Sequence, residues 1–174
     1  MKRLVFVLVV VLVGCAEQQG PSAPPQQLLS AIGTAQALQH ESDEREAQQD
    51  LPGAIEAARR VLDVPFPVGA AEREDVRLDA FGRIAELELA RHDLDAAMAR
   101  ATSGLSEATR DSYFRARLHV VLGRIHQERA ARLREGGDAD DARTESEAAI
   151  DELEQSIVIN RVVLGLGTAH GETP

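Results

Sequence analysis

The sequence predicts an all-α protein of about six helices, paired as stacked antiparallel hairpins. Helix-forming residues (Ala, Leu, Glu, Gln and Arg) dominate the chain beyond residue 25. Apolar residues recur there at three- and four-residue spacing, as on the buried face of an amphipathic helix. No run of alternating Val, Ile or Thr is long enough to suggest a sheet. Short segments containing Pro, Gly or Asp divide the chain into the six helical stretches.

The first three helices are expected over residues 26–48, 51–62 and 71–91. Pro52 suits the first turn of the second helix, because its missing N–H is not needed there. The segment Val64-Pro65-Phe66-Pro67-Val68-Gly69 breaks the chain before the third helix.

The last three helices are expected over residues 94–106, 109–134 and about 138–164. Asp93 is a predicted N-cap for the fourth helix. Gly136-Gly137 stops the fifth helix, as glycine commonly does at a helix C-terminus, and Asp138 or Asp140 caps the sixth. Together these stretches form a helical domain over residues 26–164, followed by a tail at 165–174 that we expect to be disordered.

The N-terminal end reads as a secretory signal peptide over residues 1–14. Lys2 and Arg3 precede a short apolar run, which ends in Leu12-Val13-Gly14-Cys15. About ten apolar residues are too few to cross a bilayer, which needs roughly 20. The last four residues resemble the lipobox of bacterial lipoproteins. That resemblance implies that Cys15 becomes the first mature residue and carries the lipid.

A lipid on Cys15 would make the membrane itself a binding partner, because each buried CH₂ group contributes about 0.8 kcal/mol. Residues 15–25 would then be the lipidated cysteine and a flexible tether, since they are polar and contain three prolines. Ala16 follows Cys15 where an Asp often retains lipoproteins at the inner membrane. The resemblance therefore implies the outer membrane, facing the periplasm.

Composition narrows the function further. The chain has 174 residues and a formal net charge of −10, which argues against nucleic acid as a partner. Aromatic residues make up 3% of the chain, too few for a ligand pocket with aromatic walls. No Ser/His/Asp arrangement or metal-ligand spacing stands out, and His119 and His126 lie about 10 Å apart by helix rise. We expect no enzymatic activity, no metal and no cofactor.

Two stretches repeat a pattern in which a large residue precedes an aliphatic–small pair, and an Asp and an Ala then open the next helix. Its small residues are Ala85, Ala97, Gly123 and Ala142. The pattern resembles the tetratricopeptide repeat. Ala85 and Ala97 lie twelve positions apart, the family spacing, whereas Gly123 and Ala142 lie nineteen apart. Seven extra residues are nearly two α-turns, so they lengthen the hairpin while keeping its packing face.

The repeat is less clear elsewhere, and an ordinary antiparallel helix bundle is the alternative. In the first predicted helix, Glu41 and Ser42 stand where the family places Leu-Gly. In either architecture, small side chains allow antiparallel helices to approach closely.

Three arginines, Arg110, Arg117 and Arg124, are spaced by seven in the fifth predicted helix and so share one stripe. In tetratricopeptide proteins the first helix of each hairpin lines a groove that binds peptides, so the resemblance implies that these guanidinium groups contact a partner's carboxylates. The simpler alternative is that Asp79 and Glu86 of the preceding hairpin pair with Arg117 and Arg124.

These observations predict a lipid-anchored adaptor that binds another envelope protein through its helical-repeat surface, without catalysis. Two alternatives remain open. The first alternative is a structural envelope lipoprotein whose helices self-associate into a homo-oligomer. The second is an accessory subunit of a cell-wall enzyme.

Overall fold

The computed structural model describes residues 25–166, and it confirms an all-α fold of stacked antiparallel hairpins. No strand occurs within this range. The six helices are α1 (Pro25–Ala47), α2 (Leu51–Leu62), α3 (Glu72–Ala90), α4 (Leu94–Glu107), α5 (Tyr113–Gly136) and α6 (Ala139–Val163). The predicted signal peptide, Cys15 and most of the predicted tether lie outside the described residues.

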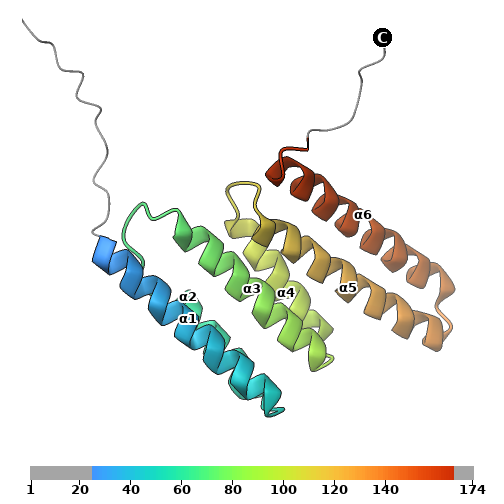
Figure 1. Ribbon diagram of the computed structural model, residues 1–174. Helices are drawn as coiled ribbons and strands as arrows, with labels where there is room; N and C mark the ends of the chain where they lie inside the picture. The colour runs from blue at the N-terminus through green and yellow to red at the C-terminus, as the bar shows by residue number, and fades with distance from the viewer. Residues whose placement is uncertain (1–24, 167–174) are drawn as a thin grey trace, which may run out of the picture.

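The helices form three hairpins, α1–α2, α3–α4 and α5–α6 (Figure 1). The first helices of the hairpins lie side by side, so that α3 packs against both α1 and α5. Helix α3 also contacts α2 and α4, which makes it the centre of the stack. Helix α6 packs against α5 and against no other described helix.

All three hairpin turns have the same backbone conformation. Each places one residue in the left-handed region, with φ of 65° at Gln49, 60° at His92 and 90° at Gly137. The aspartate that follows each of them donates its backbone N–H to the carbonyl five residues earlier, which closes the preceding helix. Its own carbonyl then accepts the first hydrogen bond of the next helix. One residue pair thus ends one helix and begins the next.

Small residues occupy the same two places in every hairpin, eight positions before and four positions after the turn aspartate. All of them are at most 1% exposed: Ser42 and Ala54, Ala85 and Ala97, Ala130 and Ala142. The structural counterpart of Ala85 is therefore Ala130, which the sequence pattern did not identify.

Gly123 is also buried, two turns before Ala130. A Cβ atom at Gly123 would lie 3.0 Å from Cγ of Leu153 in α6, so the glycine permits a close helix approach there. Because Ala130 lies twelve positions before Ala142, as Ala85 does before Ala97, the third hairpin has no seven-residue insertion at its turn, contrary to the expectation from sequence. Its helices α5 and α6 are longer at their other ends, with 24 and 25 residues compared with 19 and 14 for α3 and α4.

The largest hydrophobic cluster lies between α3, α4 and α5. Its bulky members include Leu78, Phe81, Leu118, Leu122 and Ile125. Two smaller clusters continue the core towards the N-terminal hairpin, around Ile55 and Ile84 and around Leu38 and Val61. The stack is thus held together by one core that crosses the hairpin boundaries.

The fifth helix begins at Tyr113, four residues later than the sequence predicts. Ser112 has extended backbone and its hydroxyl accepts a hydrogen bond from the backbone N–H of Arg115 at 3.1 Å, which makes it the N-cap. Thr109 instead donates its backbone N–H to Glu74 of α3 at 3.0 Å. The segment before Ser112 is therefore a loop bound to α3.

The sequence assigns Gly165 and Leu166 to a disordered tail, but both take part in closing α6. The N–H of Leu166 donates to the carbonyl of Arg161 at 2.9 Å, and Gly165 has a φ of 66°. Residues 167–174 lie outside the described range. No helix in residues 25–166 combines the length and apolarity needed to cross a bilayer.

Candidate binding surface

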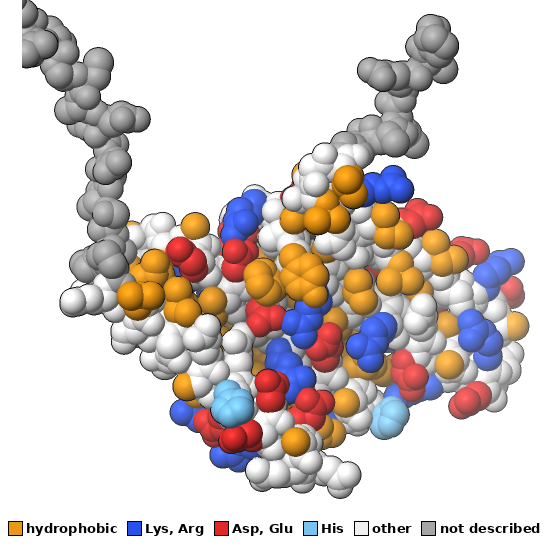
Figure 2. Space-filling model, in the orientation of Figure 1, with side chains coloured by type: hydrophobic (Ala, Val, Ile, Leu, Met, Phe, Trp, Pro, Cys, Tyr) orange, Lys and Arg blue, Asp and Glu red, His pale blue; other side chains and the backbone are white. Residues whose placement is uncertain are grey.

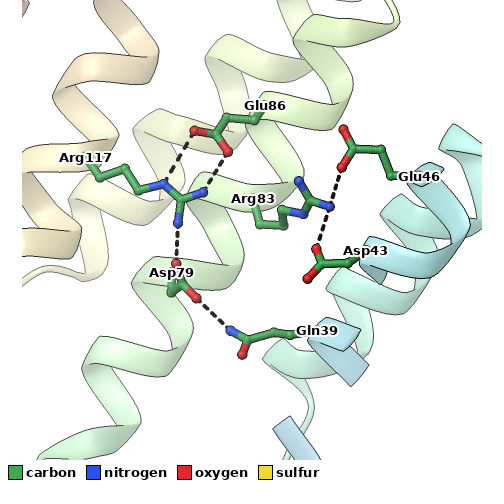
Figure 3. A network of polar contacts seen from close by, with 7 residues as sticks. All are labelled: Gln39, Asp43, Glu46, Asp79, Arg83, Glu86 and Arg117. Atoms are coloured by element: carbon green, nitrogen blue, oxygen red, sulfur yellow. Dashed lines mark hydrogen bonds and ion pairs between the residues drawn. The ribbon is translucent and has the colours of Figure 1, made fainter. Parts of the chain in front are cut away.

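A network of charged and polar side chains joins the first helices of the three hairpins (Figure 3). We call it the first-helix seam. Its members are Gln39, Asp43 and Glu46 of α1, Asp79, Arg83 and Glu86 of α3, and Arg117 of α5. In Figure 3, Arg83 points from α3 towards α1, whereas Asp79 and Glu86 both point towards Arg117.

Arg83 forms the half of the seam between α1 and α3. Its Nη2 lies 2.7 Å from Oδ1 of Asp43 and 2.6 Å from Oε2 of Glu46. Asp43 is largely exposed and Glu46 is partly exposed, so each pair contributes only about 0–1 kcal/mol.

Arg117 forms the half of the seam between α3 and α5. It pairs with both Asp79 and Glu86, the two carboxylates that the sequence pattern divides between Arg117 and Arg124. Its Nη2 lies 2.6 Å from Oε2 of Glu86, and its Nη1 pairs with Asp79. Asp79 also accepts a hydrogen bond from Nε2 of Gln39 at 2.6 Å, which ties α1 to the same carboxylate. All three charged side chains are about three-quarters buried.

Burial and neighbouring charges shift the pKa values of both Asp79 and Arg117. Burial raises the pKa of Asp79 above its ordinary value, and the charge of Glu86 adds to this, although Arg117 opposes it. Burial acts to lower the pKa of Arg117, but the hydrogen bond and charge of Glu86 outweigh it, so the pKa is raised. The guanidinium therefore stays charged, whereas burial disfavours the charged form of Asp79.

Arg110 does not share a helical stripe with Arg117 and Arg124, contrary to the expectation from sequence. It lies in the loop before Ser112, and its Nη2 is 2.6 Å from Oδ2 of Asp75 in α3. The hydrogen bonds and the charge of Asp75 raise the pKa of Arg110. Arg110 thus anchors the loop to α3, as Glu74 does through Thr109.

Arg124 differs from the other two arginines because it is exposed and forms no ion pair within the part of the chain that the structure describes. It lines an open hollow of about 360 Å³ between the C-terminal half of α3 and the middle of α5. The hollow also contains apolar surface from Leu89 and Ala90, together with Glu86, Gln127 and Glu128. A free guanidinium beside apolar surface is suited to a peptide carboxylate.

A second hollow, of about 530 Å³, adjoins the first at the α3–α4 turn, and His92 lines both. Its arginines are already engaged. Arg129 lies 2.7 Å from Oδ1 of Asp95, and Arg132 donates to the backbone carbonyl of His92 at 3.2 Å. Of the three arginines that line the two hollows, Arg124 is therefore the one without an ion pair or hydrogen bond to another described residue.

Glu88 links the second helices, and sequence reasoning missed it. This carboxylate is 3% exposed, and its Oε1 lies 3.1 Å from Arg59 of α2 and 3.9 Å from Arg100 of α4. Its other oxygen, Oε2, accepts no hydrogen bond. Glu88 precedes the turn aspartate by five positions, where the first hairpin has Arg45 and the third has Leu133, so the sequence gives no signal that a carboxylate is buried there.

The histidines of α5 contact α6. Nδ1 of His119 lies 2.6 Å from Oε2 of Glu152, and Nδ1 of His126 lies 2.5 Å from Oε2 of Glu145. These are separate pairs two turns apart. In residues 25–166 no group of three or more His, Cys, Asp or Glu side chains is arranged to hold a metal ion.

Comparison of the chain with protein-family models, with curated proteins and with solved structures gives no match. The function must therefore be argued from the residues themselves.

Proposed function

We propose that this protein is a lipid-anchored adaptor of the bacterial cell envelope that binds another envelope protein through its helical-repeat surface, with Arg124 contacting a carboxylate of the partner, and without catalysis. The observation that carries the proposal is Arg124, which is exposed in the hollow between α3 and α5 and forms no ion pair with any of residues 25–166. In a chain with a net charge of −10, most described arginines are matched by carboxylates of their own chain.

The repeat pattern supports the same proposal. Stacked hairpins place their first helices side by side, and tetratricopeptide proteins, which this sequence resembles, bind peptides on that face. The hollow lies on α3 and α5, both first helices. The seam beside it holds these helices in register before a partner arrives, so binding does not have to order them.

Arg124→Glu is expected to reduce the capture of an envelope partner at least about tenfold, because a charge-assisted hydrogen bond of about 1.5–3 kcal/mol becomes a repulsion. The measurement is a pull-down from detergent-solubilised envelope with the full-length chain as bait, quantified by mass spectrometry. Arg73→Glu is the matched control, because Arg73 is also exposed on a first helix but lies at the opposite end of α3. Equal loss with both variants would contradict a site at Arg124.

Cys15→Ser is expected to move the protein from the membrane to the soluble fraction, because the proposed anchor is lipid alone. The measurement is fractionation of the envelope, followed by immunoblotting. A high-salt wash of the unmodified chain is the control, since salt removes proteins that are held only by surface charge. Retention of the Cys15→Ser variant in salt-washed membranes would contradict the lipid anchor. It would not contradict the proposed binding site at Arg124.

A further inference from the structure

Helix α6 ends the stack with an outer surface on which large apolar side chains lie among exposed charged ones, including Asp151, Glu154 and Arg161. It packs against α5 alone, and along its other side large hydrophobic residues are 46–68% exposed. They are Ile150, Ile157, Val158, Val162, Leu164 and Leu166. Figure 2 shows hydrophobic side chains gathered along α6. The last helix of a repeat stack normally has a polar outer face, and a continuous apolar patch on a protein surface marks an interaction site.

The apolar residues form two flanks. Ile150, Ile157 and Leu164 are spaced by seven, so they follow one line for about 21 Å, with a drift of only about 20° per seven residues. Val158 and Val162 are displaced around the helix axis to the other side of the outer face.

Two opposite charges lie between these flanks. Glu154 and Arg161 are both exposed, and neither forms an ion pair with any residue in the range 25–166. They are seven positions apart, too far to pair with each other along one helix, where charges meet at three or four positions. Each is therefore available to an opposite charge on another molecule.

We propose that α6 pairs with α6 of a second copy of this chain, antiparallel, about a two-fold axis at Ile157. In this register Ile157 meets its own copy, and Ile150 meets Leu164 of the other chain. Glu154 then lies within one residue, about 1.5 Å of helix rise, of the other chain's Arg161. The two-fold axis produces this ion pair twice, as expected for an interface in which both copies use the same surface.

The other orientations fit less well. A parallel pair would place Glu154 beside Glu154 and Arg161 beside Arg161, which are repulsive contacts. A two-fold axis also keeps each flank of the helix on its own side of the interface, so the isoleucine flank packs against the isoleucine flank. Hydrophobic flanks around a reciprocal charge pair make this surface complementary to itself.

Cysteine crosslinking of the full-length chain in detergent tests the register. With oxidised glutathione, Ile157→Cys is expected to give most of the protein as covalent dimer, since a disulfide needs Cα atoms about 4.4–6.8 Å apart. Ile150→Cys alone is expected to give none, because its copies would lie about 21 Å apart. A mixture of Ile150→Cys and Leu164→Cys chains is expected to crosslink. The unsubstituted chain measures any background from Cys15.

Charge exchange tests the ion pair without disturbing the core, because both residues face solvent. Arg161→Glu is expected to raise the dimer dissociation constant about tenfold in sedimentation equilibrium, and Glu154→Arg combined with Arg161→Glu is expected to restore it. Efficient crosslinking of Ile150→Cys to its own copy would overturn the antiparallel register. A monomeric unsubstituted chain would overturn the dimer. Neither outcome bears on Arg124, which lies outside this surface.

Discussion

Replacing Gly104 by valine is expected to lower the free energy of unfolding by about 3 kcal/mol or more, the upper end of the cost of overpacking a core. Gly104 lies in α4 where it crosses α3 and α5. A Cβ atom there would lie 2.8 Å from Cβ of Phe81 and 2.9 Å from Cδ1 of Leu118. Both neighbours are buried, so neither has space to move away. Chemical denaturation followed by circular dichroism measures the loss.

Gly33→Val is the matched control for Gly104→Val. Gly33 lies in α1, is exposed, and has nothing within 4 Å of the position of a Cβ atom. The same change in volume and helix propensity is therefore expected to alter the free energy of unfolding by no more than about 0.5 kcal/mol. Equal effects at the two positions would mean that α4 does not approach α3 and α5 as closely as described.

Arg117→Met is expected to destabilise the fold by about 2–3 kcal/mol, somewhat less than the loss of one partner from a fully buried ion pair. The change leaves Asp79 and Glu86 facing the same space without the ion-pair partner that they share. Thermal unfolding at neutral pH measures the loss. Burial raises the pKa of Asp79, so its protonation as the pH falls removes the repulsion, and the difference from the unsubstituted chain should shrink towards acid pH.

Asp79→Asn is the informative counterpart of Arg117→Met. Burial raises the pKa of Asp79 in the folded state, so its ionised form opposes folding at neutral pH, and this cost disappears as the pH falls through that raised pKa. The substitution removes the charge and keeps one acceptor oxygen for Arg117, and the new NH2 group can donate to Oε1 of Gln39 once the Gln39 amide turns over. Asp79→Asn should therefore change stability little at neutral pH, and it should recover part of the loss caused by Arg117→Met. A large loss with Asp79→Asn would contradict the direction given for its pKa.

The sequence predicts the helices well because the residues that begin and end them act through contacts with their close neighbours in the chain. Asp93 caps α4 as expected, because its carboxylate accepts a hydrogen bond from the N–H of Ala96 at 3.2 Å. Gly137 ends α5 in a left-handed conformation, also as expected. The start of α5 was predicted wrongly because Thr109 is as compatible with a helix as Ser112. The choice depends on Glu74, which lies 35 positions away and draws Thr109 out of the helix.

Residues that depend on three-dimensional neighbours were missed for the same reason. Gly104 reads as a helix-weakening residue until Phe81 and Leu118 are placed against it. Glu88 reads as a surface carboxylate, although it is buried between arginines of α2 and α4.

The arginine spacing gave a mixed result. The sequence relates Arg110, Arg117 and Arg124 to a partner's carboxylates, and it offers internal carboxylates as the simpler alternative for Arg117 and Arg124 only. The structure separates them, because α3 presents Asp75 to the first and both Asp79 and Glu86 to the second. Only the relative placement of α3 and α5 shows that Arg124 extends past these acids.

The arrangement of contacts gives the stack a directional stiffness. Along α1, α3 and α5, ion pairs bridge every junction, so bending that pulls these helices apart must break charged contacts. Helices α2 and α4 do not approach each other directly, nor do α4 and α6, and Glu88 is the ionic bridge between α2 and α4. We therefore expect bending to separate the second helices from one another more easily than the first helices, which the seam links at both junctions.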